Sequence, residues 1–160
     1  MTTVHSLELK FGTARLPVSL PESAESLEIQ NPPSQTDGER FGADLRRFLR
    51  ENPLDLSRPA IVLADKTRLC GYPLYLPILL KVLQDQGADP SRITLYIAYG
   101  THPRQSEAES LQTYGEVYRH YRFVHHDCRE QQQFETLGMT PSKTPVHRRK
   151  DPARASCVIT

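Results

Sequence analysis

Two continuous apolar runs mark the middle of the chain, over residues 60–64 and 93–99. Runs of this length, rich in β-branched and aliphatic residues, are typical of strands buried on both faces of a sheet. Between them, residues 73–86 carry apolar side chains at helical spacing and are followed by Gly87, a typical helix terminator. A strand, a helix and a second strand in this order predict a β-α-β unit with parallel strands.

The pattern toward the N-terminus is different. Short apolar runs on either side of Gly12 predict a β-hairpin over residues 3–20, because glycine accepts the positive φ of a tight turn. Residues 21–37 are rich in Pro, Ser, Glu and Gln, which predicts an extended connector. Residues 38–160 then form the α/β core of a single domain that spans 1–160.

Weaker patterns complete this core. An amphipathic helix over 38–51, capped by Asp37, is predicted because apolar residues recur there at helical spacing. The other predicted elements are a helix over 106–115, strands over 122–125 and 156–159, and a loop over 137–144 built around Gly138 and Pro141. The predicted fold class is α/β, a three-layer Rossmann-like arrangement with a mostly parallel sheet. No helix follows the last strand, which suggests a domain cut from something longer.

Polar signatures stand where the two buried strands end. The first is Asp65-Lys66-Thr67-Arg68, and the second is Gly100-Thr101-His102-Pro103-Arg104. Parallel strands finish at one edge of a sheet, where open α/β sheets bind their ligands. We therefore expect an acid, two arginines and a histidine to share one crevice.

The residue types at this edge suit acid–base chemistry on an anion. His102 is held on a turn between glycine and proline, and an imidazole is a natural proton donor and acceptor near neutral pH. Arg68 and Arg104 offer fork-shaped donors for a carboxylate or phosphate, and Asp65 can orient an imidazole, a guanidinium or a ribose hydroxyl. The structural alternatives are a histidine that only caps a loop and an Asp65–Arg68 ion pair that only holds one.

Composition narrows the class of partner. The chain has 160 residues and a net charge of +1, which favours neither nucleic acid nor a membrane surface. Three widely spaced cysteines and no spanning segment favour a reducing, cytoplasmic setting. The basic run 148–150 is interpreted as a solvated loop and stays out of the candidate site. Homo-oligomerisation is left open.

The other motifs that we considered do not indicate a function. The cluster His125-His126-Asp127-Cys128 combines metal-ligating types, but adjacent strand residues point to opposite faces, so a structural role is favoured and no metal site is assigned to this chain. The glycine-rich nucleotide loops and the serine-hydrolase elbow are absent from the sequence.

Taken together, the motifs resemble a known family. The tetrad at 65–68, the segment 77–80 and the run Ala98-Tyr99-Gly100-Thr101-His102 are similar to the N-terminal domain of the lactate racemase family, the nickel-pincer-nucleotide enzymes. Residues 137–140 and 144–146 resemble the closing segment of that domain.

The resemblance implies an isomerase that interconverts the stereoisomers of a 2-hydroxy acid by hydride transfer to a nickel-pincer nucleotide. It implies that His102 is the acid/base histidine, and that Asp65, Thr67, Arg68, Gly100, Thr101 and Arg104 contact substrate or cofactor. It also implies a C-terminal domain, outside this chain, with the cofactor-bearing lysine, the nickel-ligating histidine and a second catalytic histidine. Without that domain, this chain is expected to be inactive.

The sequence departs from the family pattern in three respects. Lys66 and Leu69 replace a histidine and a proline, and the usual His-Arg-Pro order has become His102-Pro103-Arg104. Which 2-hydroxy acid is used, and whether nickel is used, stay open. The competing hypothesis is a non-catalytic module that keeps the fold and binds a small anion or a protein.

Overall fold

The computed structural model describes residues 6–25, 27 and 37–160. The chain divides into two compact units, residues 1–35 and 36–160. In the first unit, β1 (Ser6–Phe11) pairs antiparallel with β2 (Ala14–Ser19), and Gly12 has a φ of 59° in the turn between them. The predicted N-terminal hairpin is therefore confirmed; its residues 3–5 and residues 28–36 of the predicted connector lie outside the described residues.

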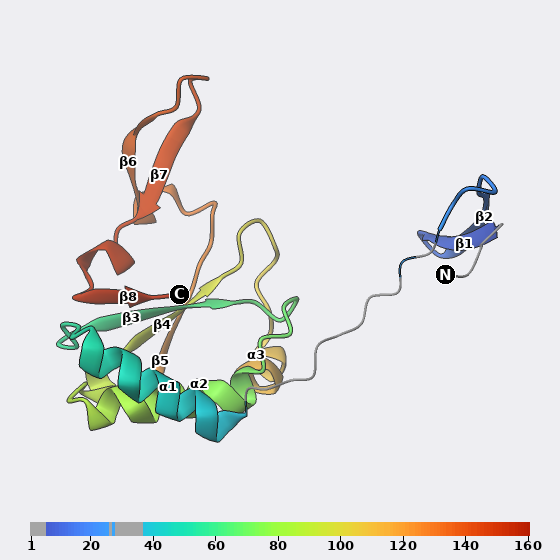
Figure 1. Ribbon diagram of the computed structural model, residues 1–160. Helices are drawn as coiled ribbons and strands as arrows, with labels where there is room; N and C mark the ends of the chain where they lie inside the picture. The colour runs from blue at the N-terminus through green and yellow to red at the C-terminus, as the bar shows by residue number, and fades with distance from the viewer. Residues whose placement is uncertain (1–5, 26, 28–36) are drawn as a thin grey trace. The chain divides into compact units, whose positions relative to one another are not determined.

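A parallel sheet forms the centre of the second unit (Figure 1). Its four strands are β3 (Pro59–Ala64), β4 (Thr94–Ala98), β5 (Arg122–His125) and β8 (Cys157–Ile159). Their order across the sheet is β5-β4-β3-β8, and every neighbouring pair is parallel. The predicted α/β class with a mostly parallel sheet is confirmed.

The register places the ends of the two central strands at the same level. Ala64, the last residue of β3, is the partner of Ala98, the last residue of β4. The loops that follow these strands therefore leave the sheet side by side. This is the edge at which the sequence places its polar signatures.

The helices gather on one side of the sheet (Figure 1), so sheet and helices form two layers rather than the three layers predicted from the sequence. They are α1 (Gly38–Glu51), α2 (Tyr72–Asp85), α3 (Glu107–Tyr114) and α4 (Val117–His120). α2 contacts both α1 and α3. Because β3, β4 and β5 follow one another in one direction across the sheet, right-handed crossovers carry both connections over the same face.

Local chemistry fixes the helix starts. The Asp37 side chain caps α1 by accepting a hydrogen bond of 2.8 Å from the Arg40 amide, as predicted. Ser106 and Glu109 form a reciprocal capping box at the start of α3. α2 begins at Tyr72, one residue earlier than predicted, and Pro77 lies inside it.

A buried apolar layer joins sheet and helices. The following side chains of β3, β4 and α2 are at most 4% exposed: Ile61, Leu63, Leu76, Leu80, Val82, Leu83, Leu95 and Ile97. Full burial of a side chain of this size contributes about 1.5–3 kcal/mol, so the layer makes a firm base for the strand ends.

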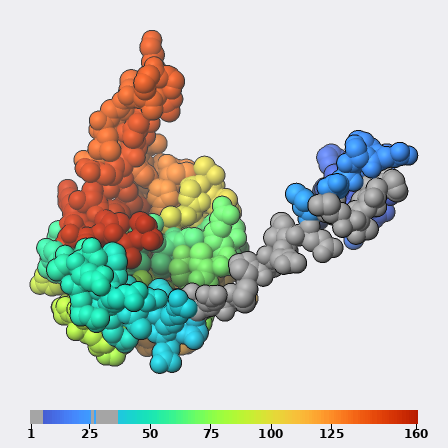
Figure 2. Space-filling model, in the orientation of Figure 1, coloured from blue at the N-terminus to red at the C-terminus, as the bar shows by residue number. Residues whose placement is uncertain are grey.

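The structure of the segment before β8 differs from the one predicted. β6 (Phe134–Met139) and β7 (Pro145–Arg149) form an antiparallel hairpin that rises from the rest of the unit in Figure 2, so a loop over all of 137–144 is wrong. Gly138 has a φ of 155° and lies at a register shift after Thr136, where the hairpin bends. The loop itself spans only residues 140–144.

Short 3-10 helices occupy Pro90–Arg92, Gln131–Gln133 and Pro152–Arg154. Within the part of the chain that the structure describes, none of the helices has the length and apolar character needed to cross a membrane.

Candidate functional site

Asp65 is the residue that follows β3, and its carboxylate is fully engaged. The residue is 4% exposed. Its Oδ1 accepts hydrogen bonds from the Thr67 amide at 3.0 Å and from the Thr67 hydroxyl at 2.5 Å. These bonds fold residues 65–67 into a tight turn and leave Oδ2 directed toward the neighbouring loop.

His102 supplies the partner of that second oxygen. Its Nδ1 lies 2.6 Å from Oδ2 of Asp65. The turn that carries His102 is closed by a hydrogen bond of 3.0 Å from the His102 amide to the Tyr99 carbonyl, and Gly100 has a φ of 60° within it. The His102 side chain is 51% exposed, so one side of the ring is held by Asp65 while the other is open.

The charge state of Asp65 determines which ring nitrogen of His102 carries a proton. Burial raises the pKa of Asp65, but the hydrogen bonds from Thr67 and His102 outweigh burial, and the pKa is lowered overall. An ionised carboxylate only accepts hydrogen bonds, so Nδ1 of His102 must donate. In the neutral ring, Nε2 is then an unprotonated acceptor, and no partner for it is found among the described residues.

Two tyrosines, Tyr114 fully buried and Tyr72 partly buried, hold the end of β3 in place. The Ala64 amide donates to the Tyr72 hydroxyl at 2.7 Å, and the Tyr114 hydroxyl donates to the Ala64 carbonyl at 2.8 Å. Burial raises the pKa of Tyr72 to about 12 and raises that of Tyr114 as well, so both stay protonated. The backbone immediately before Asp65 is thus fixed from two helices, α2 and α3.

Gln105 is a site residue that sequence reasoning missed. It is 4% exposed, and its side-chain oxygen accepts a hydrogen bond of 3.1 Å from the Lys66 amide. Its side-chain nitrogen donates to the Ser110 hydroxyl at 3.0 Å. Gln105 therefore ties the loop after β3 to the loop after β4. The role of Gln105 could not be predicted from the sequence, because a single amide side chain that joins two loops produces no repeat or regular spacing.

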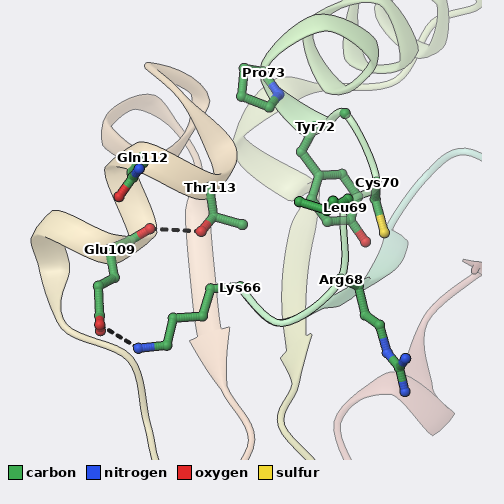
Figure 3. Close-up of a pocket in the computed structure, with 10 residues that line it drawn as sticks. Lys66, Arg68, Leu69, Cys70, Tyr72, Pro73, Glu109, Gln112 and Thr113 are labelled. Carbon is green, nitrogen blue, oxygen red and sulfur yellow. Dashed lines mark hydrogen bonds and ion pairs between the residues drawn. The ribbon is translucent and has the colours of Figure 1, made fainter. Parts of the chain in front are cut away.

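Arg68 lines a recess of about 630 Å³ between the starts of α2 and α3. Figure 3 shows Lys66 directed to Glu109, with which it forms an ion pair, while Arg68 extends away from that pair. The hydrogen bond from Lys66, together with those from Ser106, lowers the pKa of Glu109 to about 2. Lys66 is thereby engaged, whereas no carboxylate partner of Arg68 is found in the described part of the chain.

Arg104 lines a smaller recess of about 90 Å³ on the other side of His102. Gly100, Thr101 and His102 line the same recess. The loop after β5, residues 126–130, forms its far wall. An anion placed here would lie between Arg104 and His102 among the lining residues.

The contacts of His125, at the end of β5, are those of a residue with a structural role. Its Nδ1 lies 2.7 Å from the Tyr99 hydroxyl and its Nε2 lies 3.1 Å from the Tyr118 hydroxyl. Burial, and then the positive charge of Arg104, lower the pKa of His125. Both ring nitrogens are engaged, and the described residues hold no group of three or more potential metal-ligating side chains.

The structure brings the predicted residues to one edge but not into one crevice. Asp65, Thr67 and His102 form a hydrogen-bonded cluster. Arg104 borders the recess beside His102, and Arg68 borders the larger recess, where His102 does not take part. The two arginines therefore flank the Asp65–His102 pair from different hollows.

A family model matches this chain, in agreement with the fold and with the residues at the carboxyl edge of the sheet. The lactate racemase N-terminal domain model matches residues 11–160. The chain belongs to the lactate racemase N-terminal domain family. A search of curated protein sequences finds no match.

Two solved structures share the fold. The lactate racemase apoprotein from Thermoanaerobacterium thermosaccharolyticum is similar with a TM-score of 0.64 and 22% sequence identity, over 96% of this chain and 37% of that one. A crystal structure of a Thermotoga maritima protein is similar with a TM-score of 0.57 and 18% identity, over 69% of this chain and 29% of that one. The chain thus spans about a third of the length of either protein.

Proposed function

We propose that this chain is the N-terminal part of an isomerase that interconverts the stereoisomers of a 2-hydroxy acid, with His102 as its acid/base residue. The observation that carries the proposal is the 2.6 Å contact between Nδ1 of His102 and Oδ2 of Asp65. The family match supports it, because it assigns the chain to the lactate racemase N-terminal domain.

The geometry supplies a base for the substrate hydroxyl. Asp65 holds Nδ1 as the donor, so Nε2 of His102 takes the proton from the 2-hydroxyl group and returns it in the reverse direction. Loss of that proton favours departure of the C2 hydride, because the developing carbonyl draws on the oxygen lone pair.

The hydride needs an acceptor that this chain does not contain. A bound nickel-pincer nucleotide would supply the chemistry that accepts the hydride and returns it to either face of C2, which interconverts the stereoisomers. The described residues offer no metal-ligand cluster, but Arg68 is a cation without a carboxylate partner among them, beside a recess of about 630 Å³. This donor suits an anionic group of substrate or nucleotide, and the metal ligands are assigned to a C-terminal domain.

Arg104 is proposed to hold the substrate carboxylate near His102. It lines the recess that His102 and Thr101 also line, and a guanidinium matches a carboxylate with two parallel hydrogen bonds. Gly100 provides the left-handed backbone of the turn, with a φ of 60°. Thr67 acts through Asp65, whose turn it closes.

The test is racemisation of one pure enantiomer of lactate and of other 2-hydroxy acids by the chain joined to its C-terminal domain and loaded with cofactor. We expect His102→Ala to lower kcat by roughly 10²–10⁴-fold, the usual contribution of general acid–base catalysis. His120→Ala, an exposed histidine at the end of α4, is the matched control and should leave kcat unchanged. Undiminished turnover in His102→Ala would reject the assignment, and retained substrate binding without any turnover in the wild type would favour the non-catalytic anion module.

A further inference from the structure

A recess lined by arginines lies at the end of the sheet opposite to Asp65 and His102. It is formed where β3, β4 and β5 begin and has a volume of about 220 Å³. Its lining includes Arg58, Ala60, Thr94, Tyr96, Arg122 and Arg154. None of these residues belongs to the site proposed above.

The register shows which face of the sheet the recess occupies. Ala60, Thr94 and Arg122 are partners across the three strands, so their side chains project from the same face. The neighbouring residues Ile61 and Leu95 point the other way, into the core beneath the helices. The recess therefore lies on the face without helices.

Positive charge outweighs negative charge in this recess. Three arginines line the recess, and the acid among its lining residues, Asp151, already pairs with Arg149 at 3.2 Å. Within the described residues, neither Arg122 nor Arg154 has an ion pair with a carboxylate. Arg58 is already engaged, because its Nη2 donates a hydrogen bond to the Arg154 carbonyl, so Arg122 and Arg154 are the side chains free to bind an anion. Their like charges repel, and a bound anion would relieve that repulsion.

Arg149 adds a fourth guanidinium under this surface. The sequence interpretation of run 148–150 as a solvated loop is wrong for Arg149, whose side chain is 11% exposed and lies 5.8 Å from the ring centre of Tyr96. Its Nε and Nη1 are buried with no hydrogen-bond partner in the described part of the molecule. Burial raises the pKa of Tyr96 and the negative charge of Asp151 raises it further, while the charges of Arg122, Arg149 and Arg58 lower it, so the three arginines act on the same hydroxyl.

We propose that this arginine recess binds a small oxyanion of the phosphate or dicarboxylate class. Guanidinium groups match such anions with paired charge-assisted hydrogen bonds. Thr94 and Tyr96 bring hydroxyl groups to the floor of the recess. Its volume is below the roughly 300 Å³ at which pockets for drug-sized ligands begin, which suits a small anion and not a whole nucleotide.

The experiment is a titration of the 160-residue chain with inorganic phosphate and, separately, with succinate at constant ionic strength. Backbone amide NMR shifts of Ala60, Thr94 and Arg122 report on the recess itself. We expect saturable shifts there, and a dissociation constant raised roughly tenfold by Arg122→Gln and by Arg154→Gln, as for one lost charge-assisted hydrogen bond. The relative affinity for phosphate and succinate then tells which oxyanion class the recess prefers.

Arg50→Gln is the matched control, because it removes one exposed positive charge from the last turn of α1. It should leave both dissociation constants unchanged. Shifts that do not saturate, equal weakening by all three variants, or shifts confined to amides near His102 would overturn the proposal. The wild-type shift map decides the location even if a variant is unstable, and thermal unfolding of each variant shows whether it is folded.

Discussion

Nδ1 of His102 lies 2.6 Å from Oδ2 of Asp65, although 37 positions separate the two residues in sequence. The parallel register explains this contact, because Ala64 and Ala98 are partners at the ends of adjacent strands. The buried carboxylate and the half-exposed imidazole thus form a pair whose free side faces outward. This pair is the basis of the predictions that follow.

Replacing Asp65 with asparagine should damage catalysis more than binding. The amide can donate to Nδ1, which stabilises the ring tautomer with its proton on Nε2 and removes the base. In the completed, cofactor-loaded enzyme we expect kcat for a 2-hydroxy acid to fall on the order of 10²-fold with KM little changed. Asp85→Asn, on the exposed side of α2, is the control. A change in KM alone would show that Asp65 only shapes the binding site.

Asp65 should also make the stability of the chain depend on pH in the acid range. Its pKa is lowered in the folded protein, below the ordinary value of 3.8. Its contribution is therefore present above about pH 3.8, and it is lost as the pH falls through the lower folded value. We expect the difference in unfolding free energy between wild type and Asp65→Asn, measured with urea, to shrink below about pH 3.8. A difference that stays constant from pH 7 to pH 3 would contradict this.

Gln105 should couple the two site loops. Gln105→Ala leaves the Lys66 amide without its partner and removes one of the two hydrogen bonds of the Ser110 hydroxyl, and an unsatisfied buried polar group costs about 1–3 kcal/mol. We expect the unfolding free energy to fall by that amount and hydrogen exchange at the Lys66 amide to accelerate. Gln112→Ala, an exposed glutamine on α3, should change neither. Unchanged exchange at Lys66 would mean that the loops are held independently.

The hydroxyl of Tyr114 should stabilise the end of β3. Tyr114→Phe removes the donor to the Ala64 carbonyl while keeping the buried ring, and we expect a loss of about 1 kcal/mol in unfolding free energy. Tyr121→Phe is the comparison, because its hydroxyl bonds only to the side chain of Gln84 at 2.5 Å in a less buried place. Equal effects of the two variants would show that the Ala64 contact has no special weight.

The sequence predicts the central β-α-β unit and the pairing of its two polar signatures well, because long apolar runs have one plausible arrangement in an open sheet. It also predicts α1 and its Asp37 cap, since capping depends on local residues alone. Asp65 and His102 could be placed at one edge from this information. Their direct contact could not, because it depends on the conformation of both turns.

The errors have physical causes. Gly138 and Pro141 indicate a loop, but Gly138 lies in a bulged strand whose pairing with β7 is set by the partner strand. The basic run 148–150 predicts a solvated Arg149, but the tertiary contact with Tyr96 buries it. Gln105 has no local pattern, and its role appears only when the two loops are side by side. Each case is a tertiary contact that overrides a local preference.

The central claim is that Asp65 keeps the proton of the neutral His102 ring on Nδ1, so that Nε2 is free to act as a base. Nitrogen NMR of the ¹⁵N-labelled imidazole rings, recorded on the alkaline side where histidine rings as a class are neutral, measures this directly. We predict that the His102 ring is protonated on Nδ1 and that Asp65→Asn abolishes this preference. A His102 ring protonated mainly on Nε2 in the wild type would contradict the account.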